Sequence, residues 1–114
     1  MDMRETAARA KEASIRLAAL EGDLKNRALA EVARALERNA GKIAEANRSD
    51  LERSQRERLA APLLKRLRFD EDKIAEACRG LESVAGLPDP VGRALRAMEL
   101  DEGLELFQVT CPIG

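Results

Sequence analysis

The sequence contains no histidine, tryptophan or tyrosine, and its only aromatic residues are Phe69 and Phe107. Without histidine, the chain cannot form His-based metal sites, Cys–His or Ser–His nucleophile pairs, or the commonest general base. It also lacks a basic block that would attract phosphates and aromatic rings that would stack on bases. We therefore expect no catalytic residues, no bound metal and no nucleic-acid partner.

Glycine-rich loops and long apolar runs are also missing. The glycines stand singly, so no phosphate-binding loop of the usual glycine-rich type is present. No apolar run approaches the roughly 18 residues of a membrane-spanning helix. The N-terminus, MDMRETAARAKEAS, lacks the apolar segment of a signal peptide. With two cysteines and no export signal, the protein is expected in the cytoplasm, with free thiols and no membrane partner.

The residues that remain are mostly helix formers. Apolar residues make up 45% of the 114-residue chain and charged residues 36%, with much alanine, leucine, glutamate, arginine and lysine. These side chains lose little conformational entropy in a helix. The length fits one domain or part of a larger one. We expect a mainly α chain of amphipathic helices with a C-terminal β-hairpin.

Two amphipathic helices are predicted at the start of the chain. Apolar residues recur at helical spacing over about residues 3–21, and Gly22 and Asp23 are typical of a helix end and of the N-cap of the next helix. The apolar stripe of the second helix comprises Leu24, Ala28, Val32, Ala35 and Leu36. Because only EGD separates the two helices, we expect them to pack together as an antiparallel helical hairpin.

The third predicted helix carries a polar residue on its apolar stripe. The chain should bend near residues 39–41, and the following helix places Asn47 between Ile43 and Leu51 at intervals of four. We interpret Asn47 as a partly buried residue that hydrogen-bonds to another helix or to a loop. A role in binding a ligand is the alternative.

A loop and two more helices are expected before the predicted strands. SQRERLAAP is typical of a loop, and Pro62 suits the first turn of a short helix. Asp70 precedes a longer helix that should end at Gly86. Cys78 lies on the apolar stripe of that helix, where a thiol behaves as a small apolar side chain. We expect Cys78 in the core, with a reactive thiol as the alternative.

The last part of the chain carries the β signal. LPDPVG cannot be helix interior, and RALRAMEL, DEG and LELFQVTC then predict two strands around a turn. Cys111 ends the second strand, directly before Pro112, Ile113 and Gly114. It could be a nucleophile at the edge of an active site or an ordinary strand residue. Since no histidine can activate its thiol, the second interpretation is favoured.

The order of several segments resembles a known family. KEASIRLAAL, KNRALAEVARALERN, IAEANRSDL, RLRFDEDKIAEACRGLESVAGLPDPVG and CPIG follow one another. Together they resemble the N-terminal segment of glutamate-5-semialdehyde dehydrogenase, also called gamma-glutamyl phosphate reductase, over about residues 4–114. LPDPVG after KIAEACRGLESVAG is the most specific piece.

The resemblance implies a fold and an activity for the whole family. Its members belong to the aldehyde dehydrogenase superfamily and use NADPH to reduce gamma-glutamyl phosphate in proline biosynthesis. The family's catalytic cysteine and NADP(H) site would lie beyond this chain, so no catalytic, cofactor-binding or metal residues are assigned here. Cys111 would replace an apolar strand residue such as valine. Residues around Glu105 depart from the family, whose matching strand is richer in basic residues.

The resemblance also implies a division of the chain. Residues 1–92 would form a helical N-terminal segment, and residues 93–114 a β-hairpin that leads into a dinucleotide-binding α/β domain absent from this chain. The chain would then be an inactive fragment of the reductase. Alternatives are a stand-alone helical protein-interaction module or a small regulatory or structural protein. Unpaired strand edges and uncovered apolar stripes lead us to expect homo-oligomers.

Overall fold

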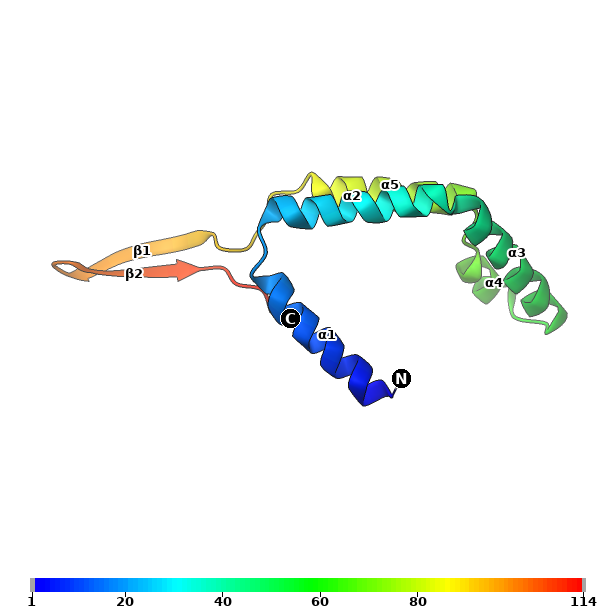
Figure 1. The fold of residues 1–114 in the computed structure, drawn as a ribbon, viewed down its shortest axis with the longest axis horizontal. Coiled ribbons are helices and arrows are strands. Elements are labelled where there is room, and N and C mark those ends of the chain that lie inside the picture. The colour runs from blue at the N-terminus through cyan, green and yellow to red at the C-terminus, as the bar shows by residue number, and fades with distance from the viewer. Residues whose placement is uncertain (1, 114) are drawn as a thin grey trace. The chain divides into compact units, whose positions relative to one another are not determined.

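The computed structural model describes residues 2–113, which form five helices and a two-stranded antiparallel sheet (Figure 1). The predicted mainly α fold with a C-terminal β-hairpin is confirmed. The helices are α1 (Met3–Ala18), α2 (Gly22–Arg38), α3 (Ala40–Arg56), α4 (Ala61–Leu67) and α5 (Glu71–Ala85), and the strands are β1 (Ala94–Asp101) and β2 (Leu104–Val109).

Two compact units make up the chain. The helical unit comprises residues 23–87, and the hairpin unit comprises the described parts of residues 1–22 and 88–114. This grouping comes from contacts within the chain. The domain boundary predicted at residues 92 and 93 concerns the longer reductases and stays a prediction.

The core of the helical unit lies where α2 and α5 run side by side in opposite directions (Figure 1). Its buried residues are Ala33 from α2 and Ile74 and Cys78 from α5. Partly buried apolar side chains pack around them: Leu36, Ala40, Ile43, Ala44, Phe69 and Leu81. The small side chain of Ala33 leaves room for α5, and the Cys78 Sγ lies 3.6 Å from the Ala33 carbonyl oxygen.

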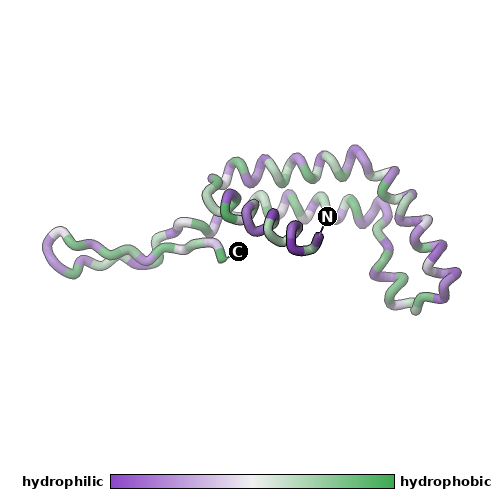
Figure 2. The backbone as a smooth tube through the Cα atoms, turned by 60° about the horizontal axis from the view of Figure 1, so that its bottom comes forward, coloured by the Kyte–Doolittle hydropathy of each residue, from purple (hydrophilic) through white to green (hydrophobic). Residues whose placement is uncertain are grey.

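Only part of the stripe predicted for α2 lies on the face that α5 covers. Leu24 and Val32 keep 41% and 50% of their surface exposed, whereas Ala33 keeps 6%. A spacing of three places Ala33 and Leu36 of α2 on the buried face, and Ala40, the first residue of α3, packs against the same core. The prediction was therefore right for Leu36 but missed Ala33, and it included Leu24 and Val32, which stay exposed. Figure 2 shows how apolar and polar residues interleave along the helices.

The predicted hairpin of the first two helices does not account for the buried face of α2, because α5 covers that face. α1 itself has no buried residue. Gly22 begins α2 instead of ending the preceding helix, and Asp23 lies in the first turn of α2, not at its N-cap.

Most other helix boundaries follow the sequence signals. The predicted bend lies at Asn39, between α2 and α3, and Pro62 occupies the first turn of α4. Asp70 caps α5 by accepting a hydrogen bond from the Lys73 backbone N–H at 3.1 Å. The predicted loop from Ser54 starts later, because α3 continues to Arg56.

Neither face of the β-hairpin is covered by other residues in the described part of the chain. β1 and β2 pair with Ala97 opposite Phe107 and Met98 opposite Leu106, and irregularities interrupt the register near both ends. Gly103 has a φ of 78°, a left-handed conformation that suits glycine in the connecting turn. Every residue of both strands is exposed. An isolated two-stranded hairpin is only marginally stable in water, so this hairpin depends on what else its residues contact.

Candidate functional site

Asn47 connects α3 to the end of α4 and to the segment that follows it. Its side-chain N–H donates to the Leu67 carbonyl oxygen at 2.9 Å, and its Oδ1 accepts from the Phe69 backbone N–H at 2.7 Å. Both ends of the amide are thus used by backbone groups about twenty positions further along the chain. The interpretation of Asn47 as a helix-to-loop hydrogen-bonding residue is confirmed.

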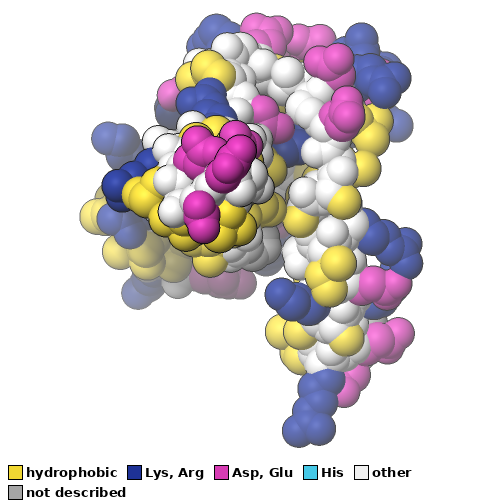
Figure 3. Space-filling model, turned by 90° about the vertical axis from the view of Figure 1, so that its left-hand side faces the viewer, with side chains coloured by type: hydrophobic (Ala, Val, Ile, Leu, Met, Phe, Trp, Pro, Cys, Tyr) yellow, Lys and Arg dark blue, Asp and Glu magenta, His cyan; other side chains and the backbone are white. Residues whose placement is uncertain are grey.

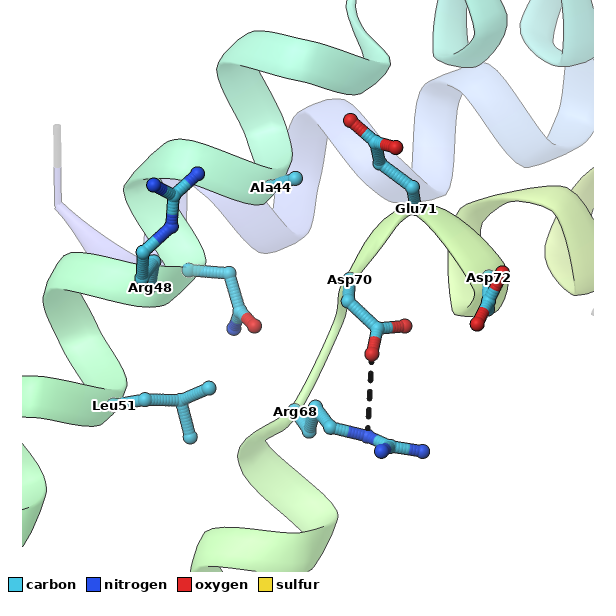
Figure 4. A pocket seen from close by; sticks show the side chains of 8 residues that line it. Ala44, Arg48, Leu51, Arg68, Asp70, Glu71 and Asp72 are labelled. Carbon is cyan, nitrogen blue, oxygen red and sulfur yellow. Dashed lines mark ion pairs between the residues drawn. The ribbon is translucent and has the colours of Figure 1, made fainter.

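An open pocket of about 480 Å³ lies beside this connection. Arg48 projects from α3 on one wall, and acidic side chains near the start of α5 lie on the other (Figure 4). The Arg68 Nε lies 3.5 Å from Asp70 Oδ2, and the other oxygen of Asp70 caps α5. The pocket is lined by Ala44, Asn47, Arg48, Leu51, Arg68, Asp70, Glu71 and Asp72.

The side chains of this pocket offer little chemistry. They include no thiol and no hydroxyl that could act as a nucleophile. The side chains of Asn47 and Asp70 already form hydrogen bonds with backbone groups, and Arg68 forms an ion pair with Asp70. We therefore regard the pocket as a surface feature of the connection between α3 and α5.

The two cysteines lie in contrasting surroundings. Cys78 is 4% exposed, and its thiol points at the Ala33 carbonyl oxygen. Its prediction as a core residue is confirmed. Cys111 is a free, exposed thiol. It lies two residues beyond β2, which ends at Val109, so the prediction that Cys111 ends the strand is wrong. The intervening Thr110 turns its hydroxyl toward the Pro90 carbonyl oxygen.

Charged side chains elsewhere form ion pairs on the helix surfaces. Lys73 donates a hydrogen bond to Glu76 at 2.8 Å, and this bond together with the lysine charge lowers the pKa of the Glu76 carboxyl.

Among residues 2–113, no group of three or more His, Cys, Asp or Glu side chains could hold a metal ion. No helix in the described part of the chain has the length and apolar character to cross a membrane.

The described residues do not fit a dinucleotide. Such a cofactor needs a strand followed by a glycine-rich turn and a helix whose backbone N–H groups face the pyrophosphate. Within residues 2–113, all helices precede the two strands, and these strands form an antiparallel hairpin. No strand-to-helix turn is therefore available in that part of the chain.

The hairpin offers an apolar candidate surface. Leu95, Leu106, Phe107 and Val109 each keep more than half of their surface exposed. A shallow groove of about 300 Å³ on the hairpin is lined by Arg96, Met98, Leu106, Phe107 and Gln108. Figure 3, which looks at the hairpin end, shows hydrophobic side chains gathered beside acidic ones. Exposed apolar clusters of this kind commonly mark interaction surfaces.

Comparison with known proteins gives a consistent result. No family model matches the chain. The chain is 59% identical to the gamma-glutamyl phosphate reductase of Pelotomaculum thermopropionicum and 55% identical to that of Acetivibrio thermocellus. Each alignment includes all 114 residues of this chain and 26% of the relative. The chain thus spans about a quarter of the length of these curated relatives.

Solved structures agree with the sequence relatives. The gamma-glutamyl phosphate reductase of Thermotoga maritima has a TM-score of 0.92 at 30% identity, over 98% of this chain and 27% of that protein. The reductase of Saccharomyces cerevisiae has a TM-score of 0.88 at 39% identity, over 98% of this chain and 29% of that protein. The predicted resemblance to the gamma-glutamyl phosphate reductases is therefore confirmed over the whole length of the chain.

Proposed function

We propose that this chain is the N-terminal part of an NADPH-dependent gamma-glutamyl phosphate reductase of proline biosynthesis, acting in the cytoplasm. The observation that carries the proposal is the 59% identity to the Pelotomaculum thermopropionicum reductase across all 114 residues. The fold supports it, because the Thermotoga maritima reductase superposes with a TM-score of 0.92. In such an enzyme these residues supply helical and hairpin framework, and other parts supply the nucleophile and the cofactor site.

We also propose that the chain alone has no reductase activity. The side chains of Cys78 and Cys111 are poor nucleophile candidates, since one is buried and neither has a histidine to activate it. The described residues also offer no turn for a pyrophosphate group. Calorimetric titration of the purified chain with NADPH should give no saturable heat. A micromolar affinity would overturn this part of the proposal.

A chimeric enzyme tests the proposal directly. The matching segment of the Pelotomaculum thermopropionicum reductase would be replaced by this chain, and phosphate-dependent reduction of NADP⁺ by glutamate semialdehyde would be followed by absorbance. Because the replaced and replacing segments are 59% identical over their full length, we expect activity within about tenfold of the parent enzyme.

Two control chimeras show how a substitution at a buried position and one at an exposed position affect folding and activity. Ile74→Asp places a charge at a position that is 2% exposed and should abolish folding of the helical unit and activity together. Ala30→Asp changes an exposed position of α2 and should leave activity unchanged. A soluble, folded chimera without activity would count against the reductase assignment.

We also propose that the chain associates with further copies of itself. The exposed apolar residues of the hairpin and the uncovered stripe of α2 around Leu24 and Val32 support this proposal. The edges of β1 and β2 add backbone groups that can pair with another strand. A stand-alone helical interaction module is the second candidate function, because the same surfaces could bind a different protein. An inactive chimera combined with a monomeric chain would favour that candidate.

A further inference from the structure

The side chain of Thr110 joins the end of β2 to the turn at the base of the hairpin. Its hydroxyl donates a hydrogen bond to the Pro90 carbonyl oxygen and accepts one from the Arg93 backbone N–H at 2.9 Å. A hydroxyl can donate one hydrogen bond and accept others, so Thr110 joins a carbonyl and an N–H on the same short turn. The turn and Thr110 are about twenty residues apart in the sequence.

Backbone bonds continue the same connection. The Gly92 N–H donates to the Thr110 carbonyl oxygen at 2.9 Å, and the Thr110 N–H donates to the Arg93 carbonyl oxygen at 2.9 Å. Gly92 adopts a φ of 76°, which an L side chain rarely tolerates. The turn at residues 89–92 is therefore held in one specific conformation where it meets the end of β2.

Asp89 closes the turn from its other side. Its Oδ1 accepts a hydrogen bond from the Val91 N–H at 3.0 Å, and its carbonyl oxygen accepts one from Arg93 Nε at 3.1 Å. A carboxylate that bonds the backbone two residues later is a standard way of fixing a turn before a strand. With Asp89 on one side and Thr110 on the other, residues 89–93 have few polar backbone groups left to pair.

This base matters because the strands themselves are weakly supported. All residues of β1 and β2 are exposed, and a lone two-stranded hairpin is marginal in water. We propose that Thr110 is a clasp that locks the base of the hairpin onto the 89–93 turn and fixes the direction in which the backbone leaves β2. The hairpin and residues 89–93 then move together as one rigid body, and the hairpin does not reorient independently of this turn. The clasp does not depend on the reductase proposal.

The test is amide hydrogen exchange of the chain with Thr110→Val, read residue by residue by NMR. Valine keeps the branched shape of threonine and replaces its hydroxyl with a methyl group. If the hydroxyl is a clasp, the amides of Gly92, Arg93 and Thr110 should all exchange about tenfold faster, because the backbone bonds open together with the side-chain bonds. Thr110→Ser retains the hydroxyl and should keep exchange close to that of the original chain.

A matched control comes from α1. Thr6 also bonds a backbone carbonyl through its hydroxyl, that of Asp2 at 3.1 Å, and it lies on an exposed helix. Thr6→Val should leave exchange at residues 92, 93 and 110 unchanged. Protection of Cys78 from a thiol reagent would show in each variant that the helical unit is still folded.

Three outcomes would overturn the clasp. Faster exchange at Arg93 alone would mean that the hydroxyl forms a single local bond and holds nothing else. Unchanged exchange at all three amides would mean that the backbone bonds suffice without it. Equal acceleration in Thr110→Ser, which keeps the hydroxyl, and Thr110→Val, which lacks it, would mean that the hydroxyl is not what protects these amides. If Thr110→Val is too unstable for NMR, trypsin cleavage after Arg93 should still be faster than in Thr110→Ser, and equal rates would reject the proposal.

Discussion

Asn47 pairs two backbone groups that the turn between α4 and α5 would otherwise leave without partners. Asn47→Ala removes both bonds, and a backbone group left unpaired at a partly buried site costs about 1–3 kcal/mol. Because water can reach part of this site, we expect a loss of about 2 kcal/mol in the free energy of unfolding. Urea denaturation monitored by circular dichroism measures it.

Asn26→Ala is the control for that experiment. Asn26 lies on the exposed surface of α2, and alanine is a better helix former than asparagine. The free energy of unfolding should change by about 0.5 kcal/mol or less. Similar losses in both variants would show that the Asn47 bonds add no stability of their own.

The two thiols provide a second prediction for single residues. Cys78 is 4% exposed and Cys111 is exposed, so a thiol reagent should modify Cys111 rapidly and Cys78 only when the helical unit opens. In Cys111→Ser the rapid phase should disappear. Adding urea should then accelerate the remaining reaction of Cys78 in parallel with unfolding. Equal native rates for the two thiols would contradict the buried position of Cys78.

Among helix ends, the C-terminus of α3 has an unusual residue. Arg58 has a φ of 58°, and the bonds of its own N–H to the Gln55 carbonyl oxygen and of the Leu59 N–H to the Ser54 carbonyl oxygen form a Schellman ending. Glycine normally fills this left-handed position, since a Cβ there costs about 1 kcal/mol. Arg58→Gly should therefore raise the free energy of unfolding by about 1 kcal/mol.

Arg56→Gly is the opposite-sign control for Arg58→Gly. Arg56 is the last residue of α3, so glycine there lowers helix propensity and should cost up to about 1 kcal/mol. Thermal denaturation of both variants compares the two effects on the same helix. Destabilisation by Arg58→Gly would mean that the arginine side chain makes a contribution larger than its backbone strain.

Helices and strands were largely predictable because their signals are local. Pro62 and Asp70 act through the first turn of their own helices, and the spacing of Ile74 and Cys78 identifies the buried face of α5. The hairpin followed from its turn residues and its β-forming runs. The end of β2 was missed, since the side-chain bonds of Thr110 depend on residues about twenty positions earlier.

For the molecule as a whole, the uncovered apolar surface predicts self-association. Light scattering coupled to size exclusion should give a mass above 12.5 kDa that rises with concentration. Phe107→Glu charges the hairpin, and Val32→Glu charges the exposed stripe of α2; the two side chains are 60% and 50% exposed. Neither change removes a buried contact, so the variant that yields monomers identifies the contact surface. A monomer at every concentration would reject self-association.

The sequence by itself determined which segments are helix or strand, which residue caps α5, and which family the chain resembles, because these depend on neighbouring residues or on residue order. Tertiary structure alone decided which face of α2 is buried. The stripe around Val32 and the stripe around Ala33 are both apolar, and only α5, forty positions later, selects the second. Ala33 is small enough for α5 to approach its backbone, and periodicity alone cannot express that fit between two surfaces.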